Sequence, residues 1–127
     1  MAAGIARKIL PEEIKVESAG IAPYGGSAAP EAIEVMKNGF DVDLRGHRSR
    51  GVTEFTLDAF DVIIAMDAHV YAHLKNNYQV DSGRLIRWEI DDPFLRGLEA
   101  FRGCARDIDG CMNEIRRIVE ERLGCEI

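Results

Sequence analysis

The sequence has no long hydrophobic run and no surplus of basic residues. Its longest uninterrupted apolar stretch is five residues, from Val62 to Met66, whereas a helix needs about 20 apolar residues to span a bilayer. Basic residues number 16 and acidic residues 22, which gives a net charge of −6. Nucleic-acid binding needs the opposite balance, because Lys and Arg neutralise the phosphates. We therefore expect neither a membrane nor a nucleic acid as partner, whereas one small anion in a local pocket is compatible with this charge.

Cysteine is also scarce: Cys104, Cys111 and Cys125 all stand in the last quarter of the chain. An odd, clustered number is typical of reduced thiols in a cytoplasmic protein rather than of a disulfide framework. Cys104 and Cys111 would lie about 10 Å apart on one helix, which is too far for a disulfide. We expect small core residues there, with a redox pair as the alternative. Arg7 and Lys8 interrupt the apolar start of the chain, so we expect no secretion signal.

Internal repeats, low-complexity segments and linkers are absent as well. The 127 residues fit one domain, since compact domains most often have about 100–150 residues. Apolar residues make up 46% and charged residues 30% of the chain, which is typical of a soluble folded protein and excludes a fibrous or disordered one. We expect residues 1–127 to form a single domain.

Apolar spacing and turn residues predict helices and strands that alternate along the chain. The expected helices cover residues 1–10, 30–39, 53–59, 68–77 and 98–123. Thr53 and Asp67 are the expected N-caps of the third and fourth of them, and Gly124 is the expected end of the last. The expected strands cover residues 13–17, 61–66 and 84–88. This order indicates an α/β fold with a mostly parallel sheet.

The start of the chain departs from the usual α/β order. Open α/β domains begin with a central strand whose C-terminal turn leads into the first helix, and ligands bind at that turn. Here the first predicted element is a helix. We therefore expect the first central strand to be missing from these residues.

Six short pieces of the sequence carry a resemblance to a known family. They are Met1-Ala2-Ala3-Gly4, Ser18-Ala19-Gly20, Pro30-Glu31-Ala32, Gly46-His47-Arg48-Ser49-Arg50, Phe60-Asp61-Val62-Ile63-Ile64-Ala65-Met66-Asp67 and Asp91-Asp92-Pro93-Phe94. In order and spacing, from Met1 to Leu123, the chain resembles the low-molecular-weight protein tyrosine phosphatases. That family includes bacterial phosphotyrosine and phosphoarginine phosphatases and the thioredoxin-coupled arsenate reductases. The resemblance implies a three-layer open parallel sheet with helices on both faces (phosphotyrosine phosphatase I-like), its first central strand missing here.

The resemblance also implies a chemistry, the hydrolysis of phosphate monoesters through a phosphocysteine. In the family, a Cys, five residues and an Arg form a loop between the first strand and the first helix, and its N–H groups bind the phosphate dianion. The positive electrostatic field of these N–H groups also stabilises the thiolate that attacks phosphorus. An Asp of an Asp-Pro loop protonates the leaving group and then takes a proton from the hydrolytic water. No metal or cofactor is expected.

Met1 matches the Met that follows the Arg-Ser-Pro end of this loop. The resemblance thus implies that these residues begin directly after the catalytic loop. The nucleophile, its Arg and the first strand would then be missing, and the chain as given would be inactive. Cys111 and Arg117 meet the Cys-x5-Arg count, but they lie inside a predicted helix, whose N–H groups are already bonded and cannot bind an anion.

Asp92 matches the general acid of the family. The reaction needs a carboxyl group that keeps its proton near neutral pH, and both the neighbouring Asp91 and a bound phosphate dianion favour the protonated form. Pro93 fixes the backbone and so orients the carboxyl group. Without the resemblance, the same three residues indicate a solvent-facing turn.

Four further residues match positions around the family's site. Ser18 and His47 match residues that hydrogen-bond the phosphate loop and hold its shape; taken alone, His47 is a surface histidine among arginines. Tyr24 and Phe94 match aromatic residues that stack on the substrate ring. Where the family often carries a second aromatic residue, this chain has Leu95, which weakens the expected ring stacking.

Two other groups of polar residues stand out. Arg45, Arg48 and Arg50 form a small basic patch that would attract an anionic substrate, or else a solvated loop. His69 and His73 are four residues apart on a predicted helix, as metal ligands can be. Since no cluster of cysteines or carboxylates accompanies them, we expect a solvated helix face and no metal.

Two classes of function stay open. The first is a phosphatase of phosphorylated proteins or small phosphate esters, of which these residues are a fragment. Protein-arginine phosphatases remain an alternative within the family, whereas arsenate reductases need two more cysteines, which residues 67–91 lack. The second is a non-catalytic module that binds other proteins. In both cases the strands at residues 13–17 and 61–65 would flank the missing strand, and their open edges predict self-association.

Overall fold

The computed structural model describes residues 1–21 and 26–124 of the chain, which form helices around a small sheet. The four helices are α1 (Ala2–Ile9), α2 (Pro30–Phe40), α3 (Ala68–Tyr78) and α4 (Leu98–Leu123). The strands are β1 (Ile63–Ala65) and β2 (Leu85–Arg87), and two short 3-10 turns are η1 (Val52–Glu54) and η2 (Leu57–Ala59). Four of the five predicted helices and two of the three predicted strands are confirmed, with shifts of a few residues at their ends, whereas the helix predicted over residues 53–59 is replaced by η1 and η2.

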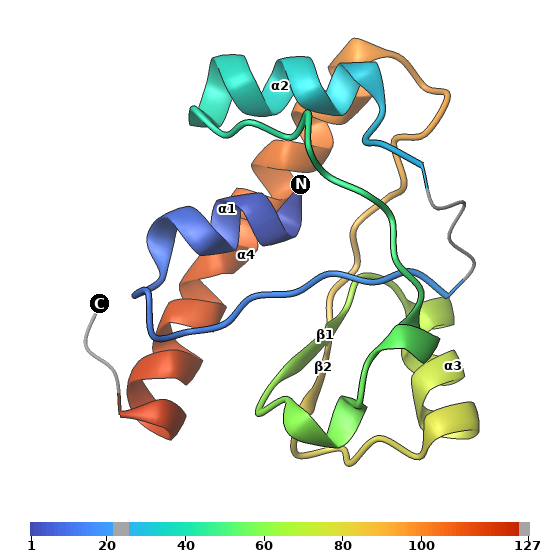
Figure 1. The fold of residues 1–127 in the computed structure, drawn as a ribbon, viewed down its shortest axis with the longest axis vertical. Coiled ribbons are helices and arrows are strands. Elements are labelled where there is room, and N and C mark those ends of the chain that lie inside the picture. The colour runs from blue at the N-terminus through green and yellow to red at the C-terminus, as the bar shows by residue number, and fades with distance from the viewer. Residues whose placement is uncertain (22–25, 125–127) are drawn as a thin grey trace.

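The sheet has helices on both faces, as predicted for an α/β fold. β1 and β2 are parallel, with Ile63 opposite Leu85 and Ile64 opposite Ile86. Successive side chains of a strand point to opposite faces: Ile64 and Ile86 pack into the core that α1, α2 and α4 share. Ala65 and Leu85 pack into a second core beneath α3. Figure 1 shows α1 and α4 on one side of the strands and α3 on the other.

The larger core is built around one stripe of α4. Apolar residues at three- and four-residue steps put one face of this helix into the core, and the buried members are Phe101, Cys104, Ala105, Ile108 and Met112. Ile5 of α1 and Met36 of α2 are buried in the same cluster. Gly4 lets α1 approach Val42, just after α2, closely, because a Cβ at Gly4 would lie 2.9 Å from Val42 Cγ1.

Two of the predicted helix ends are confirmed and one is wrong. Asp67 caps α3, since its Oδ1 accepts a hydrogen bond from the Val70 N–H at 2.8 Å, and Gly124 ends α4 with a left-handed φ of 68°. Thr53 caps no helix. The chain there forms the turn η1, whose preceding residue Gly51 donates its N–H to Glu54 Oε2 at 2.7 Å. This backbone–carboxylate bond stabilises a short 3-10 turn where the spacing had predicted a longer helix.

The strand predicted over residues 13–17 is wrong. Residues 13–16 alternate between exposed and half-buried, but a strand also needs a hydrogen-bonded neighbour, and none lies against this segment among the described residues. The Val16 carbonyl instead accepts bonds from Arg7 Nε and Nη2, at 3.2 and 2.8 Å. Within residues 1–21 and 26–124, β1 therefore pairs with β2 alone, and its second edge is open.

None of the described helices combines the length and the apolar composition that crossing a bilayer demands.

Ile108, 2% exposed on the buried stripe of α4, tests the importance of this core. Ile108→Ala should lower the free energy of unfolding by about 2–5 kcal/mol, because it leaves a cavity between α4 and its neighbours. Urea unfolding followed by circular dichroism measures the change. Glu120→Ala, at an exposed position of the same helix, is the control and should shift stability by less than about 0.5 kcal/mol. Equal effects of the two substitutions would contradict this assignment of the core.

Candidate functional site

The loop that carries Asp92 follows β2 at the carboxyl end of the sheet. The Ile90 N–H donates to the Met66 carbonyl at 3.0 Å, so the two chains run together just past β1 and β2. Beyond that point Asp92 accepts a hydrogen bond on Oδ1 from the Phe94 N–H at 3.0 Å, and the Arg96 N–H donates to the Pro93 carbonyl at 3.0 Å. These two bonds fix a tight turn in which Asp92 is exposed. In parallel sheets this end is where ligands bind.

Two apolar side chains stand in solvent beside Asp92. Phe94 is 56% and Leu95 86% exposed, although large apolar residues usually gain by burial. Leu95 also has a left-handed φ of 63°, a conformation that costs a residue with a Cβ about 1–2 kcal/mol. An exposed, strained leucine next to an exposed phenylalanine is energetically unfavourable for the free chain. Such exposed apolar side chains and backbone strain are typical of a surface used for binding.

The start of α1 and the chain that leads into this loop meet in one core cluster. Met1 packs against the buried cluster that contains Ile90 and Cys104. Burial raises the pKa of the Cys104 thiol; the Met1 amino group lowers it, and the charges of Asp107, Asp92 and Asp91 raise it. Burial in turn lowers the pKa of the Met1 amino group.

Ser18 and His47, predicted to act together, line one cavity of about 380 Å³. Its complete lining is Arg7, Ser18, Asp43, Leu44, Gly46, His47, Arg48 and Arg50. His47 is half-buried there. Burial lowers the pKa of its imidazole, and the positive charges of the Met1 amino group, Arg7, Arg50 and Arg48 lower it further. The cavity thus lies beside α1, and its lining holds three arginines and one carboxylate.

The predicted basic patch is rearranged in the structure. Arg45 turns to Asp43, which accepts bonds from its Nε and Nη2 at 3.0 and 2.9 Å. These bonds hold the pKa of Asp43 at about 2, so the pair carries no net charge at neutral pH. Arg7 of α1 joins Arg48 and Arg50 in the cavity instead. No local signal placed Arg7 there, because it is some forty residues from the other two.

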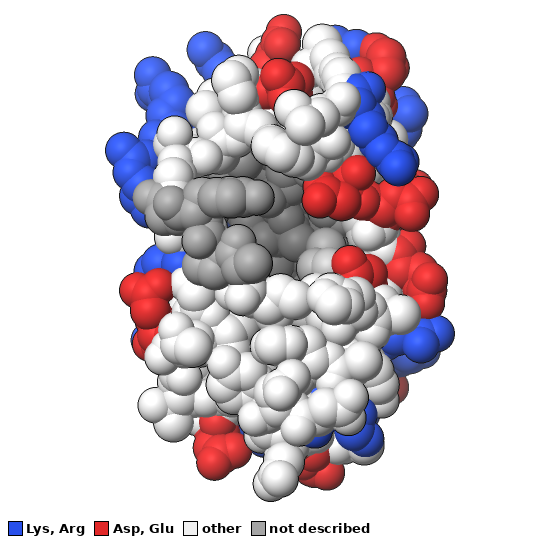
Figure 2. Space-filling view, turned by 90° about the vertical axis from the view of Figure 1, so that its right-hand side faces the viewer, with Lys and Arg blue, Asp and Glu red and all other residues white. Residues whose placement is uncertain are grey.

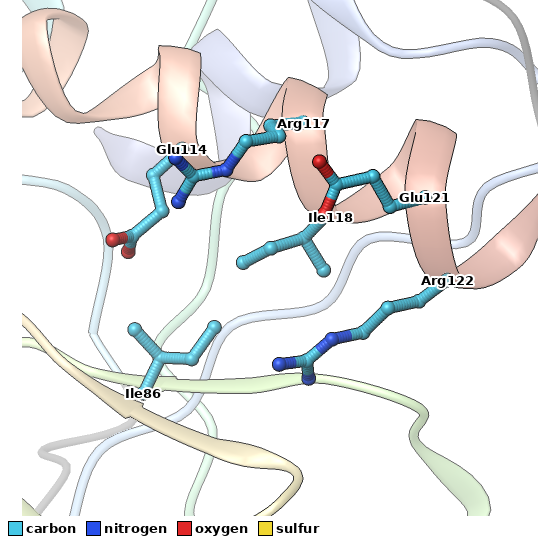
Figure 3. Close-up of a pocket in the computed structure, with 6 residues that line it drawn as sticks. All are labelled: Ile86, Glu114, Arg117, Ile118, Glu121 and Arg122. Atoms are coloured by element: carbon cyan, nitrogen blue, oxygen red, sulfur yellow. The ribbon is translucent and has the colours of Figure 1, made fainter.

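A second cavity, of about 360 Å³, lies between α4 and β2 and holds none of the predicted site residues. Figure 3 shows Ile86 of β2 and Ile118 of α4 facing each other, with charged side chains of both signs around them. The charged members are Glu114, Arg117, Glu121 and Arg122. Glu114 accepts the Trp88 indole N–H at 3.0 Å, and Arg122 donates to the Gly83 carbonyl at 2.8 Å. These two bonds tie α4 to both ends of β2.

The cysteines do not have the surroundings of a nucleophile. Burial raises the pKa of both Cys104 and Cys111, so each is a protonated thiol at neutral pH. Cys111 and Arg117 both lie within α4, where backbone N–H groups are already hydrogen-bonded. Tyr24 and Cys125 lie outside the described residues.

His69 and His73 lie on α3 as predicted. His69 is exposed, while His73 is half-buried, with its Nδ1 3.2 Å from Asn77 Nδ2. No group of three or more potential metal-binding side chains occurs in the described part of the chain.

Charges of opposite sign gather on different sides of the molecule. In Figure 2, acidic side chains gather at one edge beside the central hollow, and basic side chains line the upper part of the opposite edge. A molecule with a net charge of −6 therefore still offers locally positive surface to an anion.

Comparison with known proteins places this geometry in a family. A family model described as low molecular weight phosphotyrosine protein phosphatase matches residues 1–123. A low molecular weight protein tyrosine phosphatase from T. tengcongensis is 26% identical, with a TM-score of 0.80 over 90% of this chain and 86% of the other. Wzb of Vibrio vulnificus, solved with benzylphosphonate, is 27% identical, with a TM-score of 0.75 over 90% and 85%.

Arsenate reductases have a similar structure as well. One, solved in its oxidised state, is 26% identical, with a TM-score of 0.75 over 92% of this chain and 86% of the other. A search of curated proteins found no match.

The environment of His47 generates a titration prediction. NMR titration of its imidazole should give a midpoint below 6.5, the ordinary pKa, and Arg7→Met should raise that midpoint because a nearby positive charge is lost. The unfolded chain protonates His47 near 6.5, so it binds more protons than the folded chain just below that pH. Stability should therefore fall as pH drops through this window. A wild-type midpoint above 6.5, or a lower one in the variant, would contradict the positive surroundings.

Proposed function

The chain belongs to the low molecular weight phosphotyrosine protein phosphatase family, and from this premise we propose that its residues supply the proton donor and the supports of a cysteine-dependent phosphatase site. Asp92 is the proposed general acid. The observation that carries the proposal is the fixed turn around this carboxylate, at the carboxyl end of β2 and near the first turn of α1. That is the edge of the sheet where an anion-binding loop ahead of α1 would lie.

The proposed reaction has two steps. A thiolate forms a bond to phosphorus, the ester P–O bond breaks, and Asp92 donates its proton to the leaving oxygen. The Asp92 carboxylate then takes a proton from a water molecule as that water attacks phosphorus, and the S–P bond breaks to release phosphate. Asp92 suits both steps because it is exposed on a turn that its bond from Phe94 holds in place.

Other residues have proposed supporting parts. Ser18 and His47 line one cavity beside α1, where their side chains can hydrogen-bond a phosphate loop and hold its shape. Phe94, exposed next to Asp92, would contact the group attached to the phosphate, and the same role is proposed for Tyr24. Substrates of this site are phosphorylated proteins or small phosphate esters. The complex of the similar Wzb protein with benzylphosphonate supports this class.

The nucleophile is not supplied by the described cysteines. Cys104 is a buried, protonated thiol, and Cys111 sits inside α4. We therefore expect residues 1–127 to be inactive as they stand, with Cys and Arg contributed by a Cys-x5-Arg loop joined to α1. The odd, clustered set of three cysteines supports a reducing, cytoplasmic location.

Alternatives within and outside the family rest on separate observations. A protein-arginine phosphatase would use the same acid and supports, since the two classes differ chiefly in the Cys loop. An arsenate reductase activity is disfavoured, even though such enzymes are similar in structure, because residues 67–91 hold no cysteine to relay a disulfide. A non-catalytic protein-binding module is the second candidate, favoured by the exposed Phe94 and Leu95.

The assignment of Asp92 is tested in two polypeptides, residues 1–127 alone and the same residues preceded by a β-strand and a Cys-x5-Arg-Ser-Pro loop. The first should not hydrolyse aryl phosphates and the second should. In the extended chain, Asp92→Asn should lower kcat by about 10²–10⁴. The loss should be larger for phenyl phosphate than for p-nitrophenyl phosphate, whose better leaving group needs less protonation.

Asp91→Asn is the matched control for this test, since it removes the neighbouring carboxylate and should cost much less activity. Equal losses from Asp91→Asn and Asp92→Asn would refute Asp92 as the acid. Turnover by residues 1–127 alone that depends on Asp92 would refute the need for an added Cys loop.

The open edge of β1 leads to a proposal about self-association. Unpaired N–H and C=O groups along a strand pair readily with another chain, and β1 has one neighbour among the described residues. Sedimentation velocity of residues 1–127 should show oligomers that increase with concentration. The version extended by a strand should stay monomeric, since that strand can occupy the open edge. A stable monomer with a sharp melt for residues 1–127 would contradict this proposal.

A further inference from the structure

The stretch of chain that carries Ser18 is tied to α1 by one side chain. Arg7, in the last turn of α1, donates from Nε and Nη2 to the Val16 carbonyl at 3.2 and 2.8 Å. The main chain of residues 15–19 takes part in no other hydrogen bond within the described residues. The place of this stretch relative to α1 therefore depends on the Arg7 guanidinium.

Apolar packing alone would leave that place less well defined. The Val16 side chain packs against the larger core, but apolar contacts are non-directional. Two N–H groups of a planar guanidinium on one carbonyl oxygen set both a distance and a direction, and the positive charge strengthens both bonds. The Arg7 side chain is itself exposed, so its replacement leaves the buried core intact.

The far end of the stretch is held by the chain that carries His47. The Gly20 N–H donates to the Arg50 carbonyl at 2.9 Å, and the Gly20 carbonyl accepts from the Val52 N–H at 3.0 Å. Glu17 also forms an ion pair with Arg50. These contacts fix the end of the stretch to the segment just before η1.

Ser18 stands midway between the two anchors, two residues after Val16 and two before Gly20. Its side chain forms no hydrogen bond within the described part of the chain, so the main chain alone sets where its hydroxyl lies. Ser18 lines the cavity of about 380 Å³ together with Arg7 and His47. The bond from Arg7 to Val16 thus decides how the Ser18 hydroxyl is placed in that cavity.

We propose that Arg7 is a positioning residue for Ser18, acting through the Val16 carbonyl. The inference rests on the proposed phosphatase function, in which Ser18 supports a phosphate loop joined to α1. Because Arg7 belongs to the helix that would follow this loop, its bond to Val16 sets the distance between the loop and the Ser18 hydroxyl. Arg7 touches neither the substrate nor the reacting atoms in this role.

Lys8 offers a matched control, because it ties the same helix turn to a different segment. It is exposed like Arg7 and donates from Nζ to the Phe40 carbonyl at the end of α2. Arg7→Met and Lys8→Met each remove one positive charge and one tether of α1. Of these two tethers, the one from Arg7 leads to Ser18.

NMR relaxation of residues 1–127 tests the tether without any need for activity. The backbone order parameters of residues 16–18 should be about 0.85 in the unchanged chain and should fall to about 0.6 or lower in Arg7→Met. Lys8→Met should leave them as they are. Unchanged values in Arg7→Met, or an equal fall in Lys8→Met, would overturn the role of Arg7.

Kinetics of the chain extended by a strand and a Cys-x5-Arg-Ser-Pro loop test whether the tether serves catalysis. Arg7→Met should lower kcat by about 10–10²-fold, because small misplacements of a supporting group are costly, while Lys8→Met should stay within about twofold. In a Ser18→Ala background, Arg7→Met should cost less than about threefold, since the residue it positions is already gone. A purely structural role of Arg7 would give the same loss in both backgrounds and would overturn the proposal.

The two proposals fail in different ways. An extended chain that is inactive, or whose activity Asp92→Asn does not lower, would overturn the phosphatase proposal and leave Arg7 only the tether that the order parameters measure. Activity that depends on Asp92 but not on Arg7 would overturn the positioning role alone.

Discussion

The burial of one stripe of α4 is the interaction on which the rest of the structure depends. Ile108 and Met112, 2% and 1% exposed, stand at its centre, with α1 and α2 packed against the same helix. Polar bonds add to this contact at β2, through Trp88 to Glu114 and Arg122 to Gly83. Because α1 and the chain around β2 are both held by α4, the first turn of α1 and the Asp92 loop stay near each other. Hydrophobic burial thus positions groups that are themselves exposed and polar.

The sheet of the described residues leaves one edge of β1 without a hydrogen-bonded neighbour. β1 and β2 satisfy each other along one edge, and the apolar run before Asp67 has helices on both sides. The segment that includes Val16 has no strand to pair with in the described part of the chain. A buried or half-buried carbonyl still needs a donor, and Arg7 supplies one to Val16. That bond brings the Arg7 guanidinium to the cavity that holds Ser18 and His47.

Local electrostatics, and not the overall charge, decides what this protein can bind. The excess of six acidic charges disfavours the binding of extended polyanions, but Asp43 and Glu17 are each paired with an arginine. The remaining positive groups gather near His47, on a different part of the surface from the carboxylates of Asp91 and Asp92.

The sequence by itself determined the elements whose signals lie within a few residues. The apolar residues of α4 recur with the 3.6-residue period of a helix, Asp67 begins α3 as its N-cap, and Gly124 ends α4. Each of these signals involves residues close together in the sequence, so the elements could be predicted. The ion pair of Asp43 and Arg45 also joins residues close together in the sequence, although we expected Arg45 in the basic patch with Arg48 and Arg50. The motif with Asp92 could be recognised for the same reason, and its turn has the expected form.

Tertiary structure alone decided which residues from distant parts of the chain lie together. Residues 13–17 alternate as a strand does, but whether they pair depends on a partner elsewhere in space. Arg7 reaches the cavity of Arg48 and Arg50 only because α1 packs beside that segment. Hydrogen-bond ladders and clusters of charge join residues far apart in the chain, and no pattern within a short window encodes where those residues meet.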